Sequence, residues 1–233
     1  MSTAGRLARF AHLPVFEPDL TMLPAAQVDL WGRLGDVPES FVLYGGTALA
    51  LRLAHRESFD FDLFSAEPFR GGDLLGTLGW LGKVEVIDIS DNDLTIITPA
   101  GIKLSFFGDM GLRAVAEPSL ALANGIVVAS VFDLAGTKAK ALLDRSEWKD
   151  YVDIAALLRA GHSLADVIGY ATAIFDRLFA FPAPVFLRSL VWFGDGTAPD
   201  VPVHVQKQLE HAVRGVDFQD IPLVQPYRDS IHP

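Results

Sequence analysis

The sequence predicts an α/β (α+β) fold in which a sheet-bearing half is followed by a mainly helical half. Short apolar or alternating runs separated by Gly, Pro, Asn and Asp occupy residues 41–107, which is typical of strands joined by turns. After Pro118 the apolar residues recur at helical spacing instead. Half of the 233 residues are hydrophobic, enough to bury one large core or two modest ones. We therefore predict two domains, residues 1–117 and residues 118–233.

The elements of the first half follow from local patterns. An apolar-periodic stretch closed by glycine and proline predicts an entry helix over residues 20–34, interrupted by Pro24. Residues 41–44 form an apolar run that ends at two glycines, and an Ala- and Leu-rich stretch follows over residues 47–54. This order predicts a strand, a glycine turn and a helix. The other predicted elements are strands over residues 59–64, 84–89, 94–98 and 102–107, a hairpin turn at residues 91–93 and a helix over residues 72–81.

The second half carries helical periodicity throughout. The predicted helices span residues 132–143, 147–159, 164–178, 185–193 and 203–213. Several prolines from Pro182 onward predict an irregular tail around the last two of these helices.

The composition excludes several classes of protein. The sequence has no run of about 18 uncharged apolar residues and no secretory signal, so we expect no membrane partner and a cytoplasmic location. The absence of cysteine excludes disulfides, zinc–thiolate sites and cysteine nucleophiles. A net charge of −10 and a pI near 4.9 argue against a protein that coats nucleic acid, because such binding neutralises many phosphates. Any nucleic-acid contact is therefore expected to be local.

The strongest candidate for chemistry is the pair Asp60 and Asp62. Residues two apart on a strand point to the same side, so both carboxylates would flank Phe61, which would turn into the core. Paired carboxylates repel unless protons or a cation offset their charge, and hard oxygen ligands favour Mg2+ or Mn2+. The alternative is an exposed strand end, because a lone Asp-x-Asp pattern is short and aspartates are common there.

The residues before this strand form a candidate phosphate site. Gly45 and Gly46 allow close approach of the backbone, and the amides that begin the following helix offer unpaired donors at the positive end of its dipole. Thr47 either caps this helix or donates its hydroxyl to a phosphate. Arg52 and Arg56 lie farther along the chain, where each pairs either with phosphate oxygens or with a nearby carboxylate.

The string from Gly45 to Ser65, GGTALALRLAHRESFDFDLFS, closely resembles the first motif of the AbiEii/AbiGii toxin family. These proteins belong to the wider superfamily of polymerase-beta-like nucleotidyltransferases, in which a glycine turn precedes an Asp-x-Asp strand. The resemblance implies a polymerase-beta-like nucleotidyltransferase core with a mixed sheet. It also implies that Asp60 and Asp62 hold the metal and act in catalysis, and that the turn from Gly45 to Thr47 receives nucleotide phosphates.

A second stretch looks like later Lys and Asp motifs of the same family. It consists of DLAGTK at residues 133–138, Arg145, and KDYVDI at residues 149–154. By this resemblance Lys138 neutralises developing phosphate charge, while Asp150 and Asp153, which share a helix face, orient the nucleotide or the lysine. The helical domain would then contribute to the active-site cleft. The alternative is a solvated helix face with surface ion pairs of little energetic value.

One position departs from the pattern of this superfamily. Many polymerase-beta-like enzymes carry a third carboxylate on a later strand, where this sequence offers Ser105. Three explanations stay open: two carboxylates suffice with water and phosphate oxygens, Asp88 substitutes from a neighbouring strand, or the site binds nucleotide without turnover. Lys103 shares the side of Ser105 and is expected to be a solvated lysine, with a phosphate contact as the alternative.

The family resemblance implies a metal-dependent nucleotidyltransferase with a nucleoside triphosphate donor and an acceptor that is tRNA, another RNA or another cellular target. It also implies the toxin of a toxin–antitoxin or abortive-infection system, with a cognate antitoxin encoded nearby. Two other hypotheses remain: a catalytically inactive nucleotide-binding module with the same fold, motivated by Ser105, and a sugar-nucleotide glycosyltransferase, against which the upstream glycine turn argues. A local basic patch for RNA would comprise Arg52, Arg56, Arg70, Lys103, Lys138 and Lys140.

Overall fold

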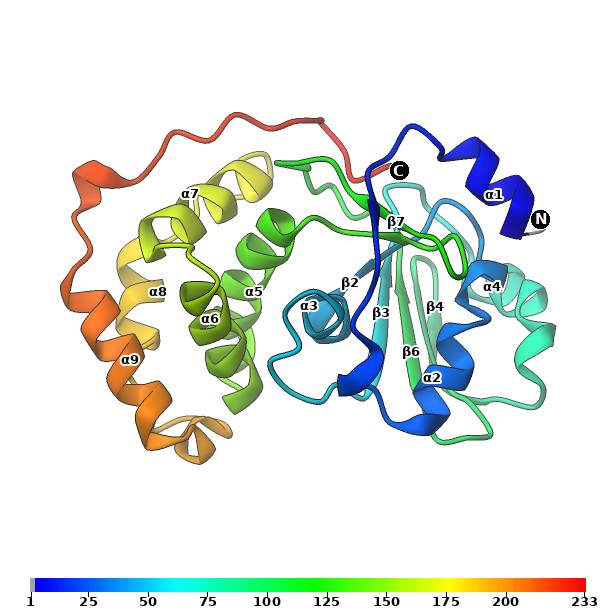
Figure 1. Ribbon diagram of the computed structural model, residues 1–233, viewed down its shortest axis with the longest axis horizontal. Helices are drawn as coiled ribbons and strands as arrows, with labels where there is room; N and C mark the ends of the chain where they lie inside the picture. The colour runs from blue at the N-terminus through cyan, green and yellow to red at the C-terminus, as the bar shows by residue number, and fades with distance from the viewer. Residues whose placement is uncertain (1–2) are drawn as a thin grey trace. The chain divides into compact units, whose positions relative to one another are not determined.

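The computed structural model describes residues 3–233, which divide into two compact units. The first, which we call the sheet unit, contains the described residues up to Leu112 together with Glu117–Ser130 and Asp229–Pro233. The second, the helical unit, contains Arg113–Ala116 and Val131–Arg228. Helices and strands of both units are labelled in Figure 1.

In the described chain, eight strands form one mixed sheet in the order β1-β7-β8-β2-β3-β6-β5-β4. Figure 1 labels several of them, including β2, β3 and β6. Their bounds are β1 Val15–Phe16, β2 Val42–Tyr44, β3 Asp60–Phe64, β4 Glu85–Ser90, β5 Asp93–Ile97, β6 Lys103–Phe107, β7 Ser119–Ala121 and β8 Val127–Val128. Strand β3 pairs antiparallel with β2 and parallel with β6, while β4, β5 and β6 pair antiparallel in succession. The predicted mixed sheet is confirmed.

The alternation along β3 separates a buried face of the sheet from a polar face. Phe61 and Leu63 are completely buried, and burial of a large apolar side chain contributes roughly 1.5–3 kcal/mol. Asp60 and Asp62 are only half-buried. The apolar residues of β3 therefore hold the strand in one orientation, which fixes both carboxylates on the opposite face.

The helices of the sheet unit differ in part from those expected. They are α1 Thr3–Arg9, α2 Ala25–Trp31, α3 Gly45–Leu53 and α4 Gly71–Thr77, with short 3-10 helices η1 Leu20–Met22, η2 Leu34–Asp36 and η3 Gly79–Leu81. The single entry helix expected over residues 20–34 is wrong, because Pro24 lacks an amide hydrogen and separates η1 from α2. The helix expected over residues 72–81 ends at Thr77 and is followed only by η3.

The helical unit confirms the predicted helical half. Its helices are α5 Val131–Arg145, α6 Trp148–Arg159, α7 Leu164–Phe175, α8 Ala183–Ser189 and α9 Val203–Arg214, with 3-10 helices η4 Ala198–Asp200 and η5 Phe218–Asp220. Gly136 lets α5 approach α7 closely, since a Cβ atom there would lie 2.5 Å from Ile174 Cδ1 and 2.9 Å from the Ala171 nitrogen. None of the described helices is long and apolar enough to cross a membrane.

Two short strands after Pro118 have no counterpart in the sequence analysis. Strand β7 pairs with β1 and β8, and β8 also pairs with β2. Each strand has only two or three residues, which is too short to show an alternating pattern. Because this segment joins the sheet, the sheet unit extends to Ser130, whereas we predicted a boundary after residue 117.

Candidate active site

Strand β3 presents Asp60 and Asp62 on the same face of the sheet, as predicted. The neighbouring strand β6 places Lys103 in register with Asp60 and Ser105 in register with Asp62. Lys103 Nζ lies 3.3 Å from Asp60 Oδ2, and the two side chains are 43% and 34% exposed. Lys103 is therefore partly solvated, as expected, and its ammonium group also pairs with the first of the two carboxylates.

The glycine turn lies directly against the second carboxylate. Gly45 has a φ of +73°, which favours glycine, and a Cβ atom built on it would lie 2.1 Å from Asp62 Oδ2. The missing side chain thus leaves the space that Asp62 fills. A Cβ atom on Gly46 would lie 2.6 Å from Arg56 Nη2, while Arg56 Nη1 donates to Glu57 O at 2.8 Å. The turn, one carboxylate and one guanidinium group therefore meet at one place.

Helix α3 begins at this turn and brings further positive character to it. Tyr44, the residue before the helix, makes no side-chain capping hydrogen bond. The first amides of a helix have no partners within the helix, and the helix dipole adds partial positive charge at this end. The start of α3 is therefore suited to an anion such as phosphate.

The role of Thr47 differs from both roles considered for it. Thr47 is buried, with 1% of its surface exposed, and its hydroxyl donates to the main-chain carbonyl of Asp60. The hydroxyl groups of Thr47 and Ser58 also form a hydrogen bond of 2.8 Å. The predictions of a cap or a phosphate contact are therefore corrected, since Thr47 ties α3 to the first residue of β3. Ser58 was missed because an isolated buried serine belongs to no recognisable motif.

Arg52 contacts main-chain carbonyl groups and an aromatic ring. Its Nε and Nη2 donate to the carbonyl oxygens of Ala129 and Val128, at 2.9 and 3.2 Å. Its guanidinium group lies 4.5 Å from the centroid of the Phe16 ring, a cation–π arrangement. These contacts give Arg52 a structural role in fastening α3 to the neighbouring strands, while its predicted phosphate contact stays a prediction.

Within the described chain, no third carboxylate joins the pair. Ser105 is in register with Asp62, Thr95 with Ser105, and Asp88 with Thr95 on the edge strand β4. Neighbouring strands lie about 4.8 Å apart, so three strand separations place Asp88 roughly 14 Å from Asp62. The suggestion that Asp88 substitutes is therefore wrong. Among the residues that the structure describes, no group of three or more His, Cys, Asp or Glu side chains is arranged to hold a metal ion.

Lys138, Asp150 and Asp153 form a buried cluster inside the helical unit. Lys138 Nζ lies 2.7 Å from Asp153 Oδ2 and 3.2 Å from Asp150 Oδ1, and the three side chains are at most 5% exposed. Arg145 donates two hydrogen bonds to Asp150, at 2.8 and 2.9 Å, so two cations balance two carboxylates. The alternative of a solvated helix face is therefore wrong for both aspartates. The catalytic role of this cluster stays a prediction.

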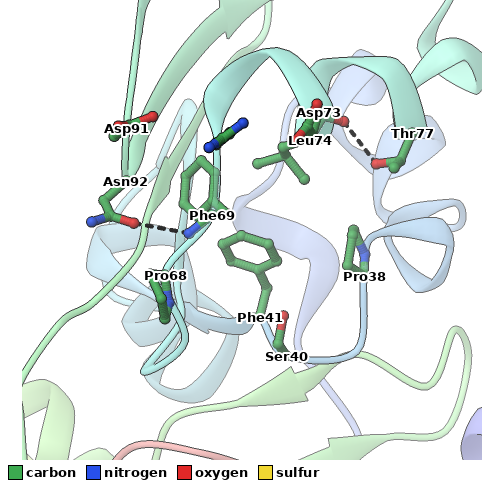
Figure 2. A pocket seen from close by; sticks show the side chains of 11 residues that line it. Pro38, Ser40, Phe41, Pro68, Phe69, Asp73, Leu74, Thr77, Asp91 and Asn92 are labelled. Carbon is green, nitrogen blue, oxygen red and sulfur yellow. Dashed lines mark hydrogen bonds between the residues drawn. The ribbon is translucent and has the colours of Figure 1, made fainter.

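A pocket of about 630 Å3 has Phe41, Phe69, Leu74 and Asn92 among its lining residues, whose side chains are shown in Figure 2. Its Phe41 and Phe69 rings meet edge to face, with 5.5 Å between centroids. Phe41 also packs against Phe106, a fully buried residue of β6, whereas Ser105 beside it belongs to the polar face. Arg70 of the predicted basic patch lines this pocket, but none of the residues predicted for catalysis, metal binding or nucleotide binding does, so it gives no information about the carboxylate pair.

The chain is similar to a known protein family, to a curated protein and to a solved structure. Residues 98–225, more than half of the chain, match the family described as "Nucleotidyl transferase AbiEii toxin, Type IV TA system". An uncharacterized protein of Aquifex aeolicus (strain VF5) is 31% identical over 158 residues, which cover 66% of this chain and 74% of that protein. The crystal structure of a proposed nucleotidyltransferase from H. pylori matches with a TM-score of 0.48 and 15% identity, over 81% of this chain and 91% of that one.

A mixed sheet with a glycine turn against paired aspartates has the features expected of a nucleotidyltransferase. The chain belongs to the AbiEii family of nucleotidyl transferase toxins, which confirms the resemblance noted in the sequence. The matched range includes Lys138, Asp150 and Asp153, whereas Asp60 and Asp62 precede it. The assignment of the carboxylate pair therefore rests on its geometry and on the first motif.

Proposed function

We propose that this protein transfers a nucleotide from a nucleoside triphosphate to an acceptor in a metal-dependent reaction. The observation that carries the proposal is the contact of the glycine turn with the carboxylate pair, where Gly45 leaves room for Asp62 Oδ2. This contact joins a backbone suited to phosphate with side chains suited to a hard cation. Membership of the AbiEii family supports the same class of reaction.

The carboxylate pair fits Mg2+ or Mn2+ by the chemistry of its donors. Asp60 and Asp62 offer charged oxygens from one face of β3 and are both partly accessible, and such hard ligands are those these cations prefer. Bound there, the cation would neutralise charge on the triphosphate and on the departing pyrophosphate. A pair of carboxylates is sufficient, because Mg2+ usually keeps several waters and takes further ligands from phosphate.

The side chains and amides around the pair position the donor. The first amides of α3 and the guanidinium group of Arg56 would bind the triphosphate at the glycine turn. Thr47 would keep β3 at a fixed distance from α3. An acceptor hydroxyl oxygen then bonds to the α-phosphorus, the bond from that phosphorus to the bridging oxygen breaks, and pyrophosphate leaves while the hydroxyl proton is released. Positioning and charge neutralisation supply most of the catalysis in such reactions.

The buried cluster of the helical unit enters the proposal through its lysine. Of the two roles considered for Asp150 and Asp153, orienting Lys138 agrees with their direct contacts to its ammonium group. A role for Lys138 in neutralising phosphate charge requires that its ammonium group exchange one of these carboxylates for a phosphate oxygen. Otherwise Lys138 and Arg145 together balance the charge of the two carboxylates.

We further propose RNA, including tRNA, as the acceptor, and a cytoplasmic toxin that a cognate antitoxin counteracts. The description of the family as toxins of type IV systems supports the toxin and antitoxin parts. The net charge of −10 restricts contact with RNA to a local patch. Abortive infection is one setting in which such a toxin would act.

The basic patch predicted for RNA is smaller than expected. Three of its members are engaged within their own units: Arg52 with carbonyl oxygens, Lys138 with buried carboxylates and Lys140 with Asp144. The other members, Arg56, Arg70 and Lys103, are partly or fully exposed. Lys103 pairs with Asp60 and Arg56 donates to the Glu57 carbonyl, but their exposure keeps these three side chains as the candidates for contact with RNA.

A nucleotide-binding module without turnover is the second candidate function. Ser105 favours it, because this residue stands in register with Asp62 where a third carboxylate was expected. Such a module would bind a triphosphate in the presence of a divalent cation and form no product. The two candidates therefore differ in one measurable property, the transfer of label to an acceptor.

The test is incubation of the purified protein with magnesium, total RNA and each nucleoside triphosphate labelled at the α-phosphate. We expect transfer of label to RNA, and loss of transfer in Asp62→Asn, which preserves shape and removes charge. The matched control is Asp88→Asn, on the exposed edge strand of the same sheet, which should transfer label normally. Nucleotide binding without transfer by the parent would favour the inactive module. Equal transfer by the parent and Asp62→Asn would exclude the proposed site.

A further inference from the structure

Lys103 gives the carboxylate pair a positive neighbour of its own. The residue stands in register with Asp60, and its Nζ lies 3.3 Å from Asp60 Oδ2. Ser105 lies two residues after Lys103 on the same face of β6 and stands in register with Asp62, where it offers a hydroxyl group in place of a carboxylate. These four side chains together carry a net charge of −1, and the guanidinium group of Arg56 at the glycine turn brings the net charge of the site to zero.

The side chains of the site therefore carry too little negative charge for two divalent ions held close together. Each ion brings two positive charges, and their mutual repulsion must be offset by carboxylates and phosphates that bridge them. A single ion that arrives with a triphosphate needs much less negative charge from the protein. The lysine is also a compact point charge with three donors, which suits an oxygen of a phosphate.

The two aspartates have different surroundings, which assigns them different tasks. Asp62 lies against Gly45, at the turn where the triphosphate would bind. Asp60 faces Lys103 on the other neighbouring strand. Both members of the Asp60–Lys103 pair are substantially exposed, and an ion pair with this exposure is weak. The ammonium group is therefore able to turn from Asp60 toward a phosphate oxygen at little energetic cost.

We propose, on the basis of the function proposed above, that Asp60 and Asp62 hold one divalent cation and that Lys103, in place of a second ion, supplies the positive charge beside Asp60. Its ammonium group would bind between Asp60 and an oxygen of the nucleotide phosphates and supply charge that a second ion supplies in a two-metal enzyme. Ser105 is then a consistent feature of the site, because a third carboxylate is unnecessary when only one divalent ion binds.

Equilibrium dialysis tests the single-ion proposal. The full chain is dialysed with Mn2+ and each α,β-methylene nucleoside triphosphate, and the ions and nucleotides bound per chain are counted. We expect one Mn2+ per bound nucleotide. Lys103→Met should weaken nucleotide binding by at least about tenfold through the loss of one charge-assisted contact, and Lys103→Arg should retain most of the affinity. The matched control is Lys83→Met, which removes another exposed lysine of the sheet unit. The double variant Lys103→Met/Ser105→Asp, with three carboxylates, should bind two Mn2+ ions.

Two Mn2+ ions bound by the parent would overturn the single-ion proposal, as would unchanged nucleotide affinity in Lys103→Met. Neither result affects nucleotidyl transfer itself. Failure of the parent to bind any of the nucleotides with Mn2+ would instead contradict the proposed function, and this inference with it. The number of ions bound by the parent is measured without any variant, so this part of the test does not depend on a substitution that could prevent folding. Thermal unfolding of each variant establishes that it is folded before its binding is compared with that of the parent.

Discussion

Replacement of Gly45 by alanine should damage the site more than the fold. The φ of +73° costs a residue with a side chain about 1–2 kcal/mol of folding free energy. The new Cβ atom would also lie 2.1 Å from Asp62 Oδ2, whereas real Cβ atoms keep at least 3.0 Å from such a neighbour. The carboxylate must therefore move by about 1 Å, and a displacement of that size costs about 100-fold in rate when it misplaces a reacting group.

A second glycine separates these two effects. Gly101 has a φ of +78° in the turn between β5 and β6, and a Cβ atom there would meet no other atom within 4 Å. Gly101→Ala should therefore lose a similar amount of stability and keep its rate of nucleotidyl transfer. Urea denaturation of both variants gives the free energies of unfolding, and initial rates of label transfer give the effect on the site. Equal rates in the two variants, whether both high or both low, would refute the argument that Gly45 makes room for Asp62.

Three further substitutions test individual polar groups. Lys138→Met leaves two buried carboxylates with a single cation, so we expect a loss of about 3–5 kcal/mol in the free energy of unfolding; a loss below about 1 kcal/mol would show that the cluster is not essential to the helical unit. Thr47→Val removes the hydroxyl that donates to the Asp60 carbonyl. The substitution should lower the free energy of unfolding by about 1–3 kcal/mol and lower the affinity for Mn2+, and Thr47→Ser should restore both. Normal Mn2+ affinity in the valine variant would argue against a positioning role for Thr47. Two causes raise the pKa of Asp93 above its ordinary 3.8: mainly burial, and to a smaller extent the nearby negative charge of Asp88. The folded state then binds the proton more tightly than the unfolded state, so stability falls as pH rises through the range above 3.8. Asp93→Asn should raise the melting temperature at neutral pH and change it little in acid, and a variant that melts lower than the parent at neutral pH would contradict this.

The parts of the fold that the sequence predicted are those with a pattern several residues long. The alternation of Asp60, Phe61 and Asp62 placed both carboxylates on one face of β3, and helical spacing revealed α5 and α6. The strands β7 and β8 exist because they pair with β1 and β2, which lie far away in the sequence. No local pattern contains that information.

The candidate site divides in the same way. The glycine turn and the carboxylate pair are recognisable from neighbouring residues, but the contact of Lys103 with Asp60 depends on the parallel register of β3 and β6. Thr47 and Arg52 belong to the motif by position, yet their hydrogen-bond partners are carbonyl groups that the tertiary fold brings to them. Position in a motif therefore predicted where these residues lie, but it did not predict the hydrogen bonds that their side chains make.

The buried cluster shows the same limit for charged residues. The spacing of Asp150 and Asp153 predicts a shared helix face and is equally compatible with a solvated surface or a buried one. Burial is decided by the packing of α5 against α6, which places Lys138 between the two aspartates. Sequence spacing alone does not determine which helix covers that face.

The most direct test of the central claim follows both products of one reaction. Nucleoside triphosphate labelled at the α-phosphate reports incorporation into RNA, and the same nucleotide labelled at the γ-phosphate reports release of pyrophosphate. We predict equal amounts of both products from the parent and neither from Asp62→Asn. Release of labelled phosphate without incorporation, or equal incorporation by Asp62→Asn, would contradict nucleotidyl transfer by this carboxylate pair.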